Sequence, residues 1–290
     1  LGVQAAPGSD FTACKPGMGG DGIRAEVTVT DSGADMTPQG PLAEQITTAT
    51  TAYGAYVRDQ SEQLVADTEE FVAAYLAGDD DLARSLYALT RMHWERIEPV
   101  AESFGDLDPK LDLREADLED GQEWTGWHRI EKDLWPPADY TAMTEAQRKA
   151  IAALLVADTA ELNSRVRDMT FTADQLGNGA KELLDEVATG KVTGEEEFWS
   201  HTDLWDFQAN VDGARVMFDS LAPVVEQKDA ALAEKLETRF SELQNLLDQY
   251  RRGEGFVLYT DLTPVQVKEL AAAVDALGEP LSNLTATVVL

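Results

Sequence analysis

The chain contains the stretch Gly126-Trp127-His128-Arg129-Ile130-Glu131, from which both a fold and a site can be predicted. On a helix His128 and Glu131 are three residues apart, so their side chains leave from the same face. Such a pair often belongs to a solvated face, but Trp124 and Trp135 flank it and favour partial burial, where a charged group needs a partner or a metal. The stretch therefore predicts half of a metal site on one helix of a helical bundle.

The other half of this site is expected on an earlier helix, in the run His93-Trp94-Glu95-Arg96-Ile97-Glu98-Pro99. Glu95 and Glu98 repeat the three-residue spacing, and bundles that hold carboxylate-bridged iron use inward Glu and Glu/His pairs in this way. Pro99 is expected to kink the helix, because proline removes the hydrogen bond to the carbonyl four residues earlier. His93 lies in an apolar stripe on the opposite face, and we expect it to be a core histidine instead of a ligand.

The composition excludes several classes of partner. The 290 residues are 43% hydrophobic, which suffices for one large domain or two moderate ones. Lys+Arg 23 against Asp+Glu 54 gives a formal net charge of -31, which argues against nucleic acid and anionic membranes and favours cations. No apolar run reaches the length of a membrane span, so no membrane insertion is expected. The single cysteine, Cys14, excludes an internal disulfide and a cysteine-based zinc site.

The first 37 residues differ from the rest and are rich in Gly, Pro, Ser and Thr. Ile23–Thr30 alternates as a strand does, and together with Phe11–Met18 it resembles the last hairpin of a cupredoxin. A blue-copper centre needs two histidines besides its cysteine, and none lies near Cys14, so copper is not expected. We interpret residues 1–37 as a cupredoxin-like remnant or an extended tail. Because the chain begins at Leu1, without methionine or a charged leader, we interpret it as a processed or truncated product.

From Pro38 onward apolar residues recur at helical spacing. Thr144 with Gln147 is typical of a capping box, and Thr263-Pro264 is typical of a helix start. Long helices joined by short loops predict an all-α fold of two four-helix bundles over residues 38–290, with a boundary near 136–144. The expected helices cover, approximately, residues 38–77, 81–98, 121–134, 145–169, 173–189, 203–225, 228–251 and 264–287.

Three runs together resemble a known family. Gly126–Glu131 matches the GxHxxE signature of the imelysin-like (M75) domain, and His93–Pro99 and Ser200–Asn210 are similar to its EfeO branch. The resemblance spans about residues 38–290. It implies an extracytoplasmic, periplasmic or cell-envelope component of the EfeUOB iron-uptake system, which captures iron and passes it to a membrane iron permease. A haem peroxidase of the same system is the other partner that the resemblance implies.

The resemblance also implies a set of metal ligands. They fall on His128 and Glu131, with Glu95 and Glu98 from the neighbouring run. An acidic residue of the connecting loop is expected to join them; our choice is Asp112 and its rival is Asp108, and spacing does not distinguish them. Several carboxylates with one imidazole suit ferrous or ferric iron, manganese or calcium, and zinc or another divalent cation can also bind.

Two other functions compete with iron binding as interpretations of the sequence. A metal-dependent protein for acidic polysaccharide (uronate) would stack sugars on Trp124, Trp127, Trp199 and Trp205 in a cleft between bundles. A metallopeptidase would be expected from the M75 label, yet the chain has no HExxH run, so we expect no enzyme activity.

A second metal site is conceivable at His201, Asp203 and Asp206. His201 and Asp203 are two residues apart and do not share a helix face, so capping of the following helix is the stronger interpretation.

Overall fold

The computed structural model of the chain describes residues 8–14, 23–30, 40–189, 191–253 and 255–289. Helices make up most of these residues, and the expectation of an all-α fold is confirmed. The long helices are α1 (Pro41–Ala77), α2 (Asp80–Glu95), α5 (Glu145–Val166), α6 (Ala173–Thr189), α7 (Asp203–Lys228), α8 (Ala230–Leu247) and α9 (Pro264–Leu281). The shorter ones are α3 (Asp108–Asp112), α4 (Trp127–Leu134) and α10 (Leu284–Val289).

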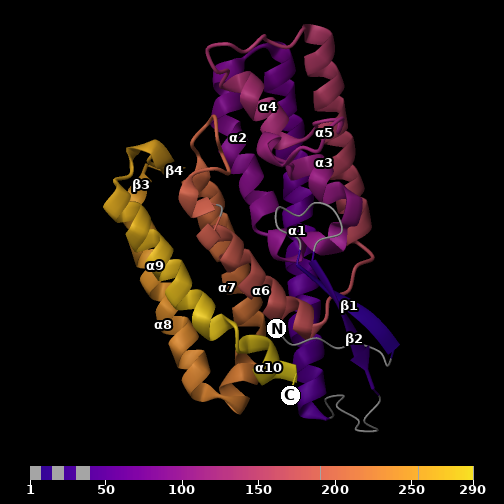
Figure 1. Ribbon diagram of the computed structural model, residues 1–290, viewed down its shortest axis with the longest axis vertical. Coiled ribbons are helices and arrows are strands. Elements are labelled where there is room, and N and C mark those ends of the chain that lie inside the picture. The colour runs from indigo at the N-terminus through magenta and orange to yellow at the C-terminus, as the bar shows by residue number, and fades with distance from the viewer. Residues whose placement is uncertain (1–7, 15–22, 31–39, 190, 254, 290) are drawn as a thin grey trace.

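The long helices pack in two groups that share α7 as their contact (Figure 1). In the first group α1 lies between α2 and α5, while the short α4 covers α2 and α5. In the second group α6, α7, α8 and α9 each contact two neighbours and close a four-helix bundle. α7 also packs against α1 and α2, so the two groups bury a common core.

The division of the chain into two bundles stays a prediction, but the helix contacts favour a different place for it. Residues 136–144 connect α4 to α5, and α5 packs along α1 in the first group. The change of group occurs after α5, at residues 167–172, because α6 packs on α7 and α9.

Several helix ends follow the sequence signals. Thr144 and Gln147 form the expected capping box, and Thr263 and Gln266 form another before Pro264. Each box satisfies backbone N–H groups that the first helical turn leaves without partners.

Two predicted helices are shorter than expected. The helix predicted over 121–134 begins at Trp127, because Gly126 has φ 85 and ψ -165, a conformation incompatible with a helix. The helix predicted to continue through Ile97 ends at Glu95, and Pro99 stands in the first turn of a 3₁₀ segment, Glu98–Leu107. The proline therefore begins a new segment instead of kinking a continuous helix, since its fixed φ and missing N–H suit a first turn.

The last predicted helix is divided. α9 ends at Leu281, two turn residues follow, and α10 begins at Leu284.

The N-terminal hairpin is formed by β1 (Gly8–Cys14) and β2 (Ile23–Val29), which pair antiparallel with Gly8 opposite Val29 and Cys14 opposite Ile23. The expected strand is therefore present. Residues 15–18 of the cupredoxin-like stretch lie outside the described residues, and the origin of this segment stays a prediction. A second two-stranded pairing joins β3 (Arg251–Arg252) to β4 (Gly255–Phe256) before α9.

Aromatic packing holds the start of α4 in the core. The Trp127 ring, fully buried, lies 5.4 Å from the ring of Phe71 and 6.1 Å from that of Tyr87 (centroid distances). Tyr87 also contacts Trp135 at 5.4 Å, so both ends of α4 are anchored by the same cluster. Because His128 directly follows Trp127, this packing places the imidazole in the interior of the protein. None of the described helices combines the length and the apolar character needed to cross a membrane.

Candidate metal centre

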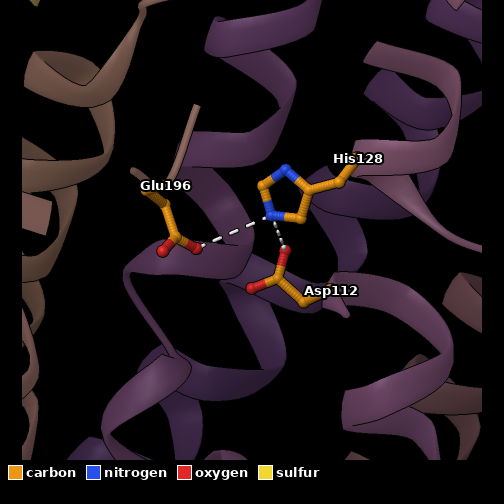
Figure 2. A group of neighbouring side chains, drawn as sticks. All are labelled: Asp112, His128 and Glu196. Carbon is orange, nitrogen blue, oxygen red and sulfur yellow. Dashed lines mark ion pairs between the residues drawn. The ribbon is translucent and has the colours of Figure 1, made fainter. Parts of the chain in front are cut away.

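Two carboxylates from separate segments converge on one ring nitrogen of His128. His128, in the first turn of α4, points Nε2 toward Asp112 at the end of α3 and toward Glu196 in the loop before α7 (Figure 2). Nε2 lies 3.4 Å from Asp112 Oδ1 and 3.6 Å from Glu196 Oε1. One ligand atom from each residue can be chosen so that all three lie within 4.8 Å of one another. We call Asp112, His128 and Glu196 the His128 cluster.

The other nitrogen of the imidazole is held by Glu131. His128 Nδ1 lies 3.3 Å from Glu131 Oε2, while Glu131 Oε1 accepts the backbone N–H groups of Trp199 (3.0 Å) and Ser200 (2.7 Å). Burial alone would raise the pKa of Glu131, but its bonds to His128 and to the Ser200 N–H lower it overall. An anionic Glu131 keeps the proton on Nδ1, which leaves Nε2 for the His128 cluster.

A close backbone contact brings Asp112 to His128. A Cβ atom on Gly126 would lie 2.1 Å from the carbonyl oxygen of Leu111, so only glycine allows the turn before α4 to approach α3 this closely. Thr125 Oγ1 donates to the Lys110 carbonyl (2.8 Å) and strengthens the contact. Trp94 Nε1 donates to Asp112 Oδ2 (2.8 Å) and orients the carboxylate.

His128 sits in a strongly negative environment. Burial and the charge of Arg91 both lower its pKa, but the carboxylates of Asp112, Glu131 and Glu196 outweigh them and raise the pKa well above its usual value. The imidazole is therefore protonated at neutral pH in the metal-free protein, and a metal ion would have to replace the Nε2 proton.

Glu95 lies on the other side of an arginine, whereas Glu98 lines the same cavity as Asp112 and Glu196. Arg91 Nη2 donates to Glu95 Oε1 and Arg91 Nη1 donates to Asp112 Oδ1, so the guanidinium separates Glu95 from the His128 cluster. The Asn210 amide donates to Glu95 Oε2 (2.9 Å) and to Glu98 Oε2 (2.7 Å). Within the described ranges, neither glutamate belongs to a group of metal-ligating atoms as close as the His128 cluster.

Glu197 is a further buried acid beside the cluster. With His128 and Glu131 it forms a second group of potential ligand atoms within 4.8 Å of one another. Burial, and then the charge of Glu131, raise the pKa of Glu197 well above its usual value. Its carboxyl accepts from Ser200 Oγ (3.0 Å) and pairs with Arg91 Nε (2.6 Å).

An acidic cavity of about 300 Å³ reaches the cluster from outside. Asp112 and Glu196 line it, and among its described lining residues Arg114 is the one basic side chain. Burial and the charge of Glu102 raise the pKa of Glu182, another lining residue. The carboxylates of the lining are Glu98, Glu102, Asp108, Asp112, Asp117, Glu182 and Glu196. Such a cavity concentrates cations at the point where two cluster carboxylates are exposed to it.

The two candidates for the loop ligand, Asp108 and Asp112, have different positions. Asp108, at the start of α3, lines the cavity, whereas Asp112 lines the cavity and also faces the imidazole.

The residues suggested for a second metal site form no close group of ligand atoms among the described residues. His201 is half-buried with φ 60, and its carbonyl accepts the Tyr259 N–H (2.9 Å). Asp203 Oδ1 accepts the Glu197 N–H (3.2 Å), and Asp206 Oδ1 lies 3.7 Å from Arg91 Nε. Both acids are buried, and the residues that they contact, Glu197 and Arg91, are neighbours of the His128 cluster. Thr202 is the N-cap residue of α7, and among the described residues its side chain makes no capping hydrogen bond, although a side-chain cap was expected here.

His93 occupies the core position expected for it. Its Nδ1 lies 2.9 Å from Gln60 Oε1 and its Nε2 lies 3.1 Å from Asp67 Oδ2. Both ring nitrogens therefore have a polar neighbour within the first group of helices, and His93 takes no part in the His128 cluster.

Asp203 is a buried acid, and its ionisation should make the stability of the protein depend on pH. Burial raises the pKa of Asp203 to about 6. Between about pH 4 and pH 6 the folded protein therefore keeps a proton on Asp203 that the unfolded chain has lost. The folded state loses stability as the pH rises through this range. Asp203→Asn keeps an oxygen acceptor for the Glu197 N–H and removes the charge. It should raise the free energy of unfolding by about 2 kcal/mol at pH 8 and leave it nearly unchanged at pH 4, measured by urea denaturation. An equal effect at both values of pH would contradict this assignment.

The tryptophans do not form one exposed platform. Trp127 is fully buried and cannot stack on a sugar, which removes one of the four residues on which the polysaccharide alternative depended. Trp124 and Trp199 are half-buried, with ring centroids 5.8 Å apart and the Lys132 ammonium 5.7 and 5.1 Å from them.

Sequence reasoning missed Arg91, Glu196 and Glu197. Arg91 stands four residues before Glu95, and this spacing on α2 is a signal for an ion pair. Glu196 and Glu197 belong to an acidic run in a loop, and nothing local distinguishes them from solvated acids.

Comparisons with known proteins identify the family. The model of the imelysin family, peptidase family M75, matches residues 49–284. An "Efem/EfeO family lipoprotein" of Staphylococcus haemolyticus is 42% identical over 241 residues, which cover 81% of this chain and 82% of that protein. The "Iron uptake system component EfeO" of Yersinia pestis is 41% identical over 264 residues, covering 90% of this chain and 69% of that protein.

A solved structure shares the fold. The crystal structure of an iron-regulated protein A precursor from Parabacteroides distasonis superposes with a TM-score of 0.63 at 13% identity, covering 89% of this chain and 98% of that one. The family model and the two relatives confirm the resemblance carried by the three sequence runs. The chain belongs to the imelysin family, among the relatives that carry the EfeO name.

Proposed function

We propose that the chain is an extracytoplasmic component of an iron-uptake system, and that it captures an iron ion at the His128 cluster and passes it to a membrane permease. The relatives named as an iron-uptake component and as a lipoprotein support the process and the location. The observation that carries the site is the buried Nε2 of His128, which faces Asp112 and Glu196 at the inner end of an acidic cavity.

In this proposal the five residues expected from the sequence have different roles. Asp112 and His128 are ligands, together with Glu196. Glu131 orients the imidazole through Nδ1, as carboxylates do for many metal-bound histidines. Glu95 and Glu98, which are held by Asn210, supply negative charge near the site without contacting the ion.

The donor set suits a carrier of hard cations. Two carboxylates and one imidazole bind iron, and zinc or manganese compete for the same donors. Three protein ligands leave coordination positions for water, so the ion can be exchanged without dismantling the protein. We propose binding without hydrolysis, because a peptidase also needs a base beside a metal-bound water, and the acids nearest to Nε2 are assigned here as ligands.

Metal binding should release protons. Because the pKa of His128 is raised well above its usual value, the ion must displace a proton from Nε2. At pH values below that pKa, the affinity for the metal should therefore increase about tenfold for each pH unit. Calorimetric titration with ferrous iron, and with Mn²⁺ as a redox-inert substitute, in two buffers of different ionisation enthalpy measures the number released. We expect about one proton for each ion at pH 7. Binding with no proton release would contradict the assignment of His128 Nε2 as a ligand.

A further inference from the structure

Arg91 is a buried cation in contact with five carboxylates. Its side chain, on α2, is 0% exposed. The guanidinium donates to Glu95 and Asp112, and its nitrogens lie 2.6 Å from Glu197, 3.7 Å from Asp206 and 3.8 Å from Glu196. These acids come from α2, α3, α7 and the loop before α7, so one side chain joins both groups of helices at this point.

Two of these five acids, Asp112 and Glu196, are the carboxylate ligands of the proposed metal site. Their oxygens therefore serve a resident cation in the metal-free protein and a metal ion in the loaded protein. Arginine cannot leave this role by losing a proton, because a guanidinium stays charged at every physiological pH. A bound metal must share the carboxylates with a fixed positive charge, which opposes its binding.

We propose that Arg91 is an internal counter-cation that holds the carboxylates of the metal site together when the site has no metal, and that it limits the affinity for the metal ion. This inference rests on the proposed function and concerns the regulation of the same site. In the metal-free protein Arg91 prevents mutual repulsion of the buried acids. In the loaded protein its charge weakens the hold on the ion, which suits a carrier that must release its cargo.

A purely structural role for Arg91 predicts the opposite sign. If the arginine only arranged the ligands, then its loss would disorder them and weaken metal binding. If it competes with the metal, then its loss leaves the acids without a counter-ion and the metal ion takes that role. The metal-free variant should then be less stable and should bind the metal more tightly.

The variant Arg91→Met replaces the guanidinium with a neutral side chain that can fill the same buried space. We expect it to bind Mn²⁺ and Zn²⁺ at least about tenfold more tightly than the wild type in calorimetric titration, since a neighbouring unit charge has been removed from a buried site. Its melting temperature without metal should fall, and its rise on adding metal should exceed that of the wild type.

A second variant guards against failure to fold. Arg91→Met with Glu95→Gln removes one positive and one negative charge, so fewer unpaired charges stay buried. Because Glu95 lies beyond Arg91, its charge is farther from the ion than that of Arg91, and this double variant should also bind more tightly than the wild type. The matched control is Arg148→Met, which removes a guanidinium bound to Asp80 and Asp133 in a separate network and should leave metal affinity unchanged.

The outcomes separate this inference from the proposed function. A wild-type protein that binds none of these ions would refute the metal site itself. A wild type that binds, with Arg91 variants that bind equally or more weakly while Arg148→Met is unaffected, would overturn the role of Arg91 and leave the metal site intact.

Discussion

Replacing His128 by alanine is expected to lower the affinity for iron and zinc by at least about 100-fold. The change removes the only nitrogen donor of the His128 cluster and leaves Asp112 and Glu196 bound to Arg91. Loss of a residue that only orients a ligand already costs about 10–100-fold in metal affinity, so loss of a ligand should cost more. Calorimetric titration at pH 7.5 measures the change, after circular dichroism has shown native helix content.

The matched control is His201→Asn. It removes an imidazole outside the cluster, and asparagine tolerates the positive φ of this position better than most residues. Its metal affinity should equal that of the wild type. If His128→Ala binds normally and His201→Asn does not, the ion is held near the start of α7 and the assignment of the cluster is wrong.

Replacing Gly126 by alanine should have the largest effect on stability, about 3–5 kcal/mol in the free energy of unfolding. Gly126 has φ 85 and ψ -165, which is almost exclusively a glycine conformation, and an added Cβ would lie 2.1 Å from the Leu111 oxygen. Both atoms in the clash are held by the backbone, so α3 and the start of α4 must separate. Because this contact aligns Asp112 with His128, the variant should also lose metal affinity. Urea denaturation measures the loss of stability.

Gly121→Ala is the control for this change. Gly121 has nearly the same φ, 86, but an added Cβ would meet nothing within 4 Å. Alanine there should cost only the left-handed conformation, about 1–2 kcal/mol, and leave metal binding intact. Equal losses in the two variants would show that conformation alone, and not the approach of α3 to α4, explains the glycine in the Gly126–Glu131 stretch.

The fold was largely predictable because each long helix carries its own signals. Apolar residues at helical spacing, Gly78 after α1 and the box of Thr144 with Gln147 all act over a few residues. The errors occur where distant contacts decide the backbone. Residues 121–126 have helical neighbours in sequence, but Gly126 turns away to meet α3.

The candidate site was predictable in part for the same reason. His128 and Glu131 are three residues apart on one helix face, and they are close in space. Asp112 also lies close to His128, but spacing in the sequence does not distinguish it from Asp108. Glu196 is 68 residues after His128 by number and reaches the imidazole only because a loop between α6 and α7 lies against α4. Periodicity gives no information about such a contact.

Sequence spacing alone also predicts Glu95 as a ligand without showing what lies between it and the His128 cluster. Its spacing to Glu98 resembles that of a ligand pair, but a residue one turn earlier on α2, Arg91, places a guanidinium between Glu95 and the cluster. A sequence pattern identifies which acids share a helix face, and it does not identify which of them a neighbouring cation has already bound.

Locating the ion tests the assignment of the His128 cluster most directly. Anomalous scattering at the absorption edge of iron, from crystals grown with ferrous iron under nitrogen, places the metal independently of any variant. If the His128 cluster holds the iron, one strong peak should lie about 2.0–2.3 Å from His128 Nε2 and from carboxylate oxygens of Asp112 and Glu196. A peak between Glu95 and Glu98, a peak at His201, or no peak in protein that binds iron in solution would contradict this assignment.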